Sequence, residues 1–386
     1  MAQRGMIRKR GLSWTAYWWV DTRQGSSQRS KGGFPAQREA KSFLTETLAA
    51  IQAGEFAEPT KLRVDDYLVC RWLPGRRASL RPSTYDSYRR NLELHAVPAI
   101  GQVQLQHLRT DHLDRLYADL LAGGLAPKTV RNIHTMIHKA LKDAVRKSLV
   151  ARNVADAADP PRLRRSGEVE MSTWDAKQLR TFFDAVAEHR LRVAFLLGAT
   201  TGMRRGEVLG LRWSDLDLRR RRVTIVQTVL NVGYEITMGT PKTARGRRTL
   251  ALDVETVRTL QEHRQRQDDE KAVAGRAYVD HDLVFARPDG SPLHPDIYSQ
   301  TFRRVVRRLG LPYIRLHDLR HTHATMGLAA GIPVKVMSTR LGHATTAFTQ
   351  DIYMHVVPSL EDSAAEKIAD LIFRDDAGSG HEPRDS

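Results

Sequence analysis

Alternating apolar residues near the start of the chain predict a β-strand over residues 12–20. A Gly/Ser turn at 24–27 and a second short strand near 28–32 follow it. Pro35 then leads into a helix that reaches Ala53, and Gly54 is placed to end it in a left-handed conformation. The residues at every second position of the first strand share one face: Trp14, Ala16, Trp18 and Val20.

A small sheet with one packed helix is therefore expected over residues 1–58, with the aromatic cluster as its core. The opposite face of the sheet is polar, and strands with such a face can also contact DNA. Its basic residues are Lys9, Arg10, Arg23, Arg29 and Lys31.

Helical spacing of apolar residues dominates residues 60–155. Pro82 lies in the first turn of one helix, and Thr110 caps a second that ends at Gly123-Gly124. Pro127 opens a third helix with a continuous apolar stripe: Val130, Ile133, Ile137, Ala140, Leu141, Ala144 and Val145. Its other face is either ordinary solvated surface or a DNA contact, and it carries Lys128, Arg131, Asn132, His134, His138 and Lys142.

Residues 156–169 are rich in proline, charge and small side chains, a composition typical of linkers. Ser172 with Asp175 then resembles a capping box that opens a further domain over 170–375. This domain begins and ends with helical patterns and has strand-like runs at 223–229, 234–238 and 248–252. We expect a multidomain, mainly α protein with small β-sheets and a frayed tail at 376–386.

The charge balance points to a polyanionic partner. The 386 residues carry a net charge of +17 with a pI near 10.2, and nucleic acid is the commonest polyanion, although a merely basic enzyme is the alternative. Residues 61–165 hold the largest share, with 20 basic against 10 acidic side chains. No apolar run approaches the ~18 residues of a membrane span, so a cytoplasmic protein without membrane contact is predicted.

Three segments far apart in the chain carry side chains suited to attack on a phosphodiester: 201–207, 317–321 and 341–355. Guanidinium groups can grip two non-bridging phosphate oxygens with parallel hydrogen bonds. Imidazoles can move protons, and a phenol can act as an oxygen nucleophile. The residues that supply these groups are Arg204, Arg320, His317, His343 and Tyr353.

Two further residues fit the same chemistry. Lys242 lies in a turn between strand-like runs, from which an ammonium can protonate a departing alkoxide. Glu207 lies three residues after Arg204 and can orient that arginine. A free tyrosine has a pKa near 10, so only about 0.1% is phenolate at pH 7. Tyr353 therefore needs neighbouring positive charge and a histidine acceptor.

Simpler interpretations exist for each motif taken alone. Arg204 and Glu207 also fit an ordinary surface pair, and a metal site from His317, His321 and His323 has to be weighed. No cysteine lies near those histidines, and Asp318 faces another side of the helix, so no metal is expected. No glycine-rich phosphate loop is present, and no cofactor is expected. The lone Cys70 is interpreted as a core residue of a helix.

The order TGxRxxE, then a hairpin lysine, then HxLRH, then LGH followed ten residues later by Tyr353 resembles the tyrosine recombinases, the integrases of phages and integrative elements. The resemblance covers roughly residues 170–373 and fills every catalytic position. Residues 60–155 are similar in layout to the family's core-binding domain. Residues 1–58 resemble the arm-type DNA-binding domain of the larger integrases.

The resemblance implies DNA strand cleavage and rejoining through a 3′-phosphotyrosine on Tyr353, without metal or ATP. Arg204 and Arg320 would clamp the scissile phosphate, with a further hydrogen bond from His343. His317 would manage the tyrosine proton and Lys242 the 5′-oxygen, and Glu207 would support the arrangement. The expected contacts to double-stranded DNA come from Lys128, Arg131, Lys142, Arg245 and Arg247. Arg248 is a further candidate for a contact to the DNA backbone.

The resemblance also implies a homotetramer on DNA and accessory partners, namely an excisionase and a DNA-bending protein. After Tyr353, an amphipathic helix either packs on its own core or docks on the neighbouring subunit. Its apolar residues are Leu360, Ala364, Ile368, Leu371 and Ile372. The alternatives to an integrase are a recombinase that resolves chromosome dimers, a non-catalytic DNA-binding regulator and a type IB topoisomerase.

Overall fold

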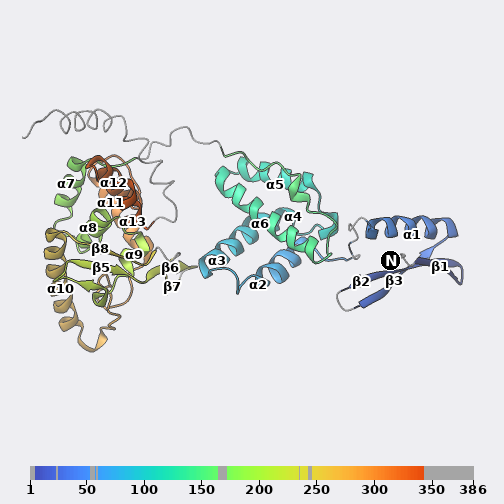
Figure 1. The fold of residues 1–386 in the computed structure, drawn as a ribbon, viewed down its shortest axis with the longest axis horizontal. Helices are drawn as coiled ribbons and strands as arrows, with labels where there is room; N and C mark the ends of the chain where they lie inside the picture. The colour runs from blue at the N-terminus through green and yellow to red at the C-terminus, as the bar shows by residue number, and fades with distance from the viewer. Residues whose placement is uncertain are drawn as a thin grey trace, which may run out of the picture. The chain divides into compact units, whose positions relative to one another are not determined.

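The computed structural model describes residues 5–22, 25–52, 57, 60–163, 172–233, 235–241 and 246–342 (Figure 1). The chain divides into two compact units, Met1–Gly167 and Glu168–Ser386. Helices predominate and the sheets are small, which confirms the predicted fold class. Among the helices in these ranges, none is both long and apolar enough to cross a lipid bilayer.

The first unit begins with an antiparallel sheet in the order β1-β2-β3, against which the helix α1 packs. Its elements are β1 (Gly5–Arg10), β2 (Ser13–Thr22), β3 (Gly25–Phe34) and α1 (Gln37–Gln52). Ala16 and Trp18 are buried, as the alternation predicted, and they pack against the buried Leu44 of α1. Trp14 lies outside that core because the pairing of β2 with β3 shifts register between Trp14 and Ala16.

Residues 60–163 form a helical bundle with its own core. Its α-helices are α2 (Leu73–Gly75), α3 (Pro82–Asn91), α4 (Val97–Ile100), α5 (Thr110–Ala122) and α6 (Pro127–Arg146), with π-helical turns at Asp66–Trp72 and Leu92–Ala96. The predicted apolar stripe of α6 is buried except for Val145 at its end, which is partly buried.

Two local predictions for this bundle were wrong. Cys70 lies on a helical turn as expected, but it is exposed because the neighbouring Tyr67 and Leu68 occupy the buried side. Thr110 is the first residue of α5 rather than its cap, and its hydroxyl donates to the Val154 carbonyl (3.2 Å).

The second unit places helices around a three-stranded sheet, β4-β5-β8, and a separate hairpin, β6-β7. Its helices are α7 (Ala176–Ala185), α8 (Arg192–Thr201), α9 (Arg205–Leu209), α10 (Val254–Ala274), α11 (Pro295–Arg308), α12 (Asp318–Ala329) and α13 (Val334–Leu341). Its strands are β4 (Leu216–Asp217), β5 (Arg222–Ile225), β6 (Thr228–Val232), β7 (Glu235–Gly239) and β8 (Arg248–Ala251). The run predicted as one strand at 223–229 is thus divided between the sheet and the hairpin.

The predicted capping box of α7 is centred on a different residue. Asp175, not Ser172, caps the helix, because its carboxylate accepts from the Gln178 amide (2.7 Å) and the Gln178 side chain accepts from the Asp175 amide (3.0 Å). The cap therefore comes three residues later than the sequence pattern indicated.

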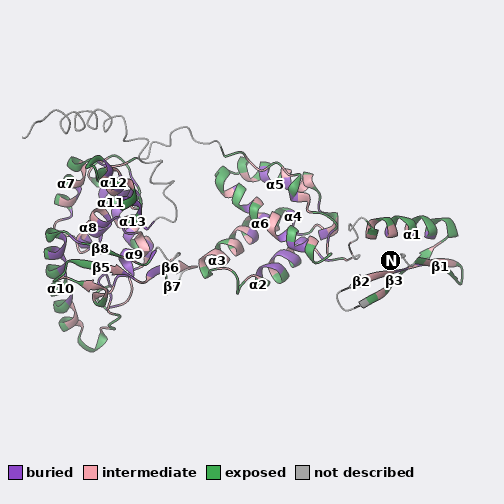
Figure 2. Ribbon diagram, in the orientation of Figure 1, coloured by how far each residue is buried: buried purple, intermediate pink, exposed green. Residues whose placement is uncertain are grey.

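A cluster of aromatic rings fixes the helices that carry the candidate site. Phe195 of α8 stacks on Tyr298 of α11, with ring centroids 5.0 Å apart, and Phe182 of α7 packs edge-on against Phe195. Figure 2 colours the buried residues of the ribbon purple. Burial of such large rings is worth roughly 1.5–3 kcal/mol each, so the end of α8 is held rigidly. The chain turns there towards Arg204.

Candidate active site

The first predicted site residue, Arg204, follows a sharp turn at the end of α8. Gly202 ends this helix with φ +66°, a left-handed conformation that suits glycine. The Arg204 side chain is about 39% exposed and donates from Nη1 to Glu207 Oε1 (2.8 Å) and from Nη2 to the Gly342 carbonyl (3.2 Å). Arg204 therefore has one side against the protein and one side open.

Glu207 is buried and lies between two arginines. Its Oε2 accepts from the Arg204 backbone amide (2.9 Å) and from Arg248 Nη2 (3.0 Å). Burial alone would raise the pKa of this carboxyl, but the hydrogen bonds and charge of Arg248, with the charge of Arg204, hold the pKa below its ordinary value. Glu207 is therefore an anion at pH 7.

Arg320, on the first turn of α12, is almost completely buried, with 3% of its surface exposed. Its Nη1 donates to the Gly202 carbonyl and its Nη2 to the Leu341 carbonyl, both at 2.6 Å. Burial, with the positive charge of Arg204, lowers the pKa of Arg320 to about 9. The side chain still remains protonated at pH 7.

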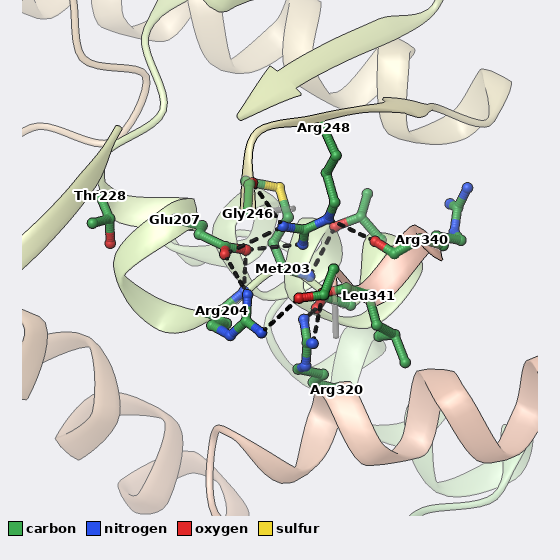
Figure 3. Close-up of polar contacts among 12 residues, drawn as sticks. Met203, Arg204, Glu207, Thr228, Gly246, Arg248, Arg320, Arg340 and Leu341 are labelled. Atoms are coloured by element: carbon green, nitrogen blue, oxygen red, sulfur yellow. Dashed lines mark hydrogen bonds and ion pairs between the residues drawn. The ribbon is translucent and has the colours of Figure 1, made fainter. Parts of the chain in front are cut away.

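Three arginines converge on the last turn of α13 (Figure 3). Arg248 Nε donates to the Arg340 carbonyl (2.7 Å), Arg320 to that of Leu341 and Arg204 to that of Gly342. These are consecutive carbonyls at a helix end, where backbone acceptors have no partner within the helix. The structure thus brings Arg204, Glu207 and Arg320 together, as the motifs predicted, at the point where the chain continues to residue 343.

His317 is the N-cap residue of α12 and remains exposed to solvent. Desolvation by the protein around its ring lowers the pKa of His317, and His321 and Arg320 act in the same direction. It borders a cavity of about 430 Å³, whose polar lining includes Arg205, Gln300, Arg303, Arg315 and His317. A neutral imidazole at the edge of a basic cavity can accept a proton.

His323 and Arg340 form a second polar layer behind Arg320. His323 Nδ1 lies 2.9 Å from the Ala199 carbonyl and its Nε2 accepts from Arg340 Nε (3.2 Å). Burial and the charge of Arg340 lower the pKa of His323 to about 4. Both ring nitrogens are thus engaged with protein groups. Within the described ranges no three His, Cys, Asp or Glu side chains are grouped to hold a metal ion.

Several predicted residues lie outside the described part of the chain: Lys242, Arg245, His343, Tyr353 and the amphipathic helix after it. The segment that contains Lys242 connects β7 to β8. Lys128, Arg131 and Lys142 are exposed on α6, and Arg247 is exposed just before β8. Arg131 also donates to the Pro161 carbonyl (3.2 Å).

The structure corrects the interpretation of Arg248 as a contact to the DNA backbone. Its side chain is only 7% exposed and is paired with Glu207. The sequence could have indicated that Arg248 faces inward, because side chains alternate between the two faces of a strand. Arg248 shares a strand face with the buried Leu250 and, just past the strand end, with Leu252. No pattern in the sequence indicated that Arg340 is part of the site, because its partners come from distant segments.

Comparison with known proteins shows which family this chain resembles. Residues 172–359 match the model described as "Phage integrase family", and residues 67–121 match "Phage integrase, N-terminal SAM-like domain". Together the two matches span well over half of the chain. A "Tyrosine recombinase XerC-like" protein of Caldanaerobacter subterraneus is 29% identical, over 87% of this chain and 90% of its own length. The ICEBs1 integrase of Bacillus subtilis is 24% identical, over 79% of this chain and 82% of its own length.

Solved structures show the same fold. The integrase of the transposon Tn1549, in complex with a circular intermediate DNA, superposes with a TM-score of 0.67 at 19% identity, covering 80% of this chain and all of that one. A lambda integrase dimer bound to a core site superposes with a TM-score of 0.56 at 16% identity, covering 96% of this chain and 95% of that one. The convergent arginines, the fold and the two family matches lead to one conclusion: this chain belongs to the phage integrase family and is a tyrosine recombinase.

Proposed function

We propose that this recombinase is a site-specific integrase that cleaves double-stranded DNA through Tyr353 and rejoins it. The observation that carries the proposal is the convergence of Arg204 and Arg320 at the end of α13. A guanidinium has five N–H donors, so each arginine can hold its backbone carbonyl and still donate to a phosphate. The 3′-phosphate of the cut strand would be carried on the tyrosine.

The remaining steps follow from the proton balance of the reaction. The Tyr353 oxygen forms a bond to phosphorus while the bond to the 5′-oxygen breaks. A neutral His317 would accept the phenolic proton, Lys242 would return a proton to the 5′-oxygen, and His343 would add a hydrogen bond to the phosphate. One phosphodiester is exchanged for one phosphotyrosine, so no ATP is required for the bond exchange.

The proposed DNA contacts follow the positive charge. Lys128, Arg131 and Lys142 occupy the exposed side of α6, in the segment with the largest basic excess. Arg247, with Arg245 two residues before it, would contact the backbone near the hairpin lysine. The basic cavity beside His317 would accept phosphates that flank the cleaved one.

The proposed domain plan and partners complete the picture. Residues 1–58 would bind arm-type sites, 60–155 the core site, and 170–375 would cut, with a linker at 156–169 and a tail at 376–386. The protein would act in the cytoplasm as a homotetramer, joined through the helix after Tyr353. An excisionase and a DNA-bending protein would set the direction of a reaction that conserves bond energy.

Covalent trapping tests the proposal directly. A duplex carrying its attachment site and a nick beside the cleavage position releases a short fragment after cleavage and so prevents rejoining. The wild-type protein should form an adduct that resists SDS, whereas Tyr353→Phe should bind the same duplex and form none. An adduct with the phenylalanine variant would remove Tyr353 from its role.

A second candidate function is resolution of chromosome dimers, favoured by the relative named XerC-like. The β1-β2-β3 sheet with α1 favours the integrase, since it would serve as the additional, arm-binding module of this proposal. Footprinting on the DNA of the element decides between them. An integrase should protect arm sites outside the crossover core, whereas a dimer resolvase should protect the core alone.

A further inference from the structure

Arg248 links the two halves of the candidate active site although it lies outside the predicted catalytic set. It is the first residue of β8, and its guanidinium contacts the nearby Gly246 carbonyl (3.2 Å) and two groups from distant segments. Nη1 and Nη2 donate to the two carboxylate oxygens of Glu207 (3.3 and 3.0 Å), and Nε donates to the Arg340 carbonyl (2.7 Å). One planar group therefore connects β8, α9 and α13 (Figure 3).

Glu207 passes this constraint on to Arg204. Each carboxylate oxygen is shared: Oε1 accepts from Arg204 Nη1 and Arg248 Nη1, and Oε2 from the Arg204 amide and Arg248 Nη2. The two side chains of the Glu207–Arg248 pair are only 4% and 7% exposed. A buried anion with four donors around it has a single orientation, so the Arg204 guanidinium inherits that orientation.

We propose that Arg248 is a positioning residue for DNA strand cleavage, a role that rests on the proposed recombinase function. Through Glu207 it orients Arg204, and through the Arg340 carbonyl it fixes the helix end from which the chain runs on to His343 and Tyr353. Arg248 thereby couples the phosphate clamp to the segment that carries the nucleophile. It does not itself touch the phosphate.

Stability alone does not account for this arrangement. A buried ion pair is weak support for stability, because well-packed apolar side chains of similar volume often serve as well. Geometry is the more demanding requirement, since a misplacement of 1 Å near reacting groups can reduce a rate by about 10²-fold. A lysine could neutralise Glu207, but one ammonium cannot reproduce the planar fork that meets both the carboxylate and the carbonyl.

The chain contains a matched control at a distance from the site. Arg190 also makes a two-point contact with a carboxylate, that of Glu270 (2.9 and 2.6 Å), and also donates to a backbone carbonyl, that of Ala286 (2.5 Å). Arg190→Met therefore removes a similar, although more exposed, set of hydrogen bonds from the same unit without touching Arg204, Glu207 or α13.

The experiment measures single-turnover adduct formation on the nicked duplex at saturating full-length protein, together with DNA affinity and melting temperature. The variants are Arg248→Met, Arg248→Lys, Arg190→Met and the double variant Glu207→Gln/Arg248→Met. We expect Arg248→Met to cleave about 10²-fold more slowly while DNA affinity stays near that of wild type. Arg248→Lys should be more stable than Arg248→Met but should still cleave more slowly than wild type. Arg190→Met should lower the melting temperature without a comparable loss of cleavage rate.

A pH profile separates positioning from a merely structural role. Glu207 faces Arg204, Arg248 and, more distantly, Arg320. In Arg248→Met, Glu207 stays buried but loses its main counterion. The pKa of the Glu207 carboxyl therefore rises. The cleavage rate should then fall as pH drops through a new titration that wild type lacks, and the double variant should lose that titration.

The outcomes are distinct. A wild-type protein that forms no adduct on its site overturns the recombinase proposal and this inference with it. An active wild type whose Arg248 variants cleave no more slowly than Arg190→Met overturns the inference alone. A pH profile of Arg248→Met that matches wild type also overturns the inference alone, because the charge of Glu207 would then not depend on Arg248. If Arg248→Met fails to fold, the cleavage rate of Arg248→Lys decides.

Discussion

Gly202→Ala should destabilise the second unit and slow cleavage for two separable reasons. The first is the backbone, because Gly202 has φ +66°, a region that costs an L-residue about 1–2 kcal/mol. The second is space, because an alanine Cβ would lie 2.6 Å from Leu341 Cδ2 and 2.8 Å from His323 Cδ2. Neither neighbour moves easily, since Leu341 is fully buried and His323 is hydrogen-bonded at both nitrogens.

Overpacking of this kind typically costs a further 1–3 kcal/mol. The control is Gly310→Ala, since Gly310 has φ +63° but an alanine Cβ there would meet no atom within 4 Å. The control therefore isolates the backbone cost. At roughly 2–4 °C per kcal/mol for a unit of this size, we expect Gly202→Ala to melt about 2–12 °C below Gly310→Ala.

The cleavage rate should also fall more in Gly202→Ala than in Gly310→Ala. The Gly202 carbonyl accepts from Arg320 Nη1 (2.6 Å), so a shift of this turn moves the guanidinium. Loss of one donor to a developing charge costs about 10²–10³ in rate, which is the upper limit for Gly202→Ala. Calorimetry and single-turnover cleavage measure the two effects. Equal melting temperatures and equal cleavage rates for the two alanine variants would refute this reasoning.

Three further predictions follow from charge. Binding to the attachment site should weaken by about 10³–10⁵ between 50 and 200 mM salt if six to ten phosphates are contacted, and a flat titration would contradict the proposed contacts. Asp143→Asn should destabilise the helical bundle by about 1–3 kcal/mol, because hydrogen bonds from Arg76 and Trp72 hold the pKa of Asp143 low against its burial. That difference should be full above pH ~4 and shrink as pH falls further, since the stabilising charge is then lost; calorimetry across pH checks it. In the DNA-free protein His317 should titrate below pH ~6.5 by NMR, and a midpoint at or above that value would contradict the lowering of its pKa.

Local pattern predicted most of the elements. Pro82 and Pro127 each mark the first residue of a helix, and the apolar stripe of α6 is its buried face. β1 was missed because GMIRKR has too few apolar residues to show alternation, and it forms through pairing with β2. Its existence depends on a partner strand, which local sequence does not encode.

The residues of the candidate site likewise fall into those that the sequence predicted and those that it did not. Arg204, Glu207 and Arg320 were recognised from motifs, and the structure brings them together. The roles of Arg248 and Arg340 depend on contacts between segments up to 140 residues apart, such as Arg340 with the Thr200 carbonyl. Such contacts follow from tertiary packing rather than from spacing along the chain.

The end of α13 has an electrostatic consequence for the free enzyme. Three like charges, Arg204, Arg248 and Arg320, gather there and would repel one another. The C-terminus of a helix carries about half a negative elementary charge, and Glu207 contributes a full one. The backbone dipole and one carboxylate thus serve as built-in counterions, so the cationic cluster can assemble before any nucleic acid arrives. In the proposed clamp role, a bound phosphate would therefore meet an arginine cluster that is already assembled.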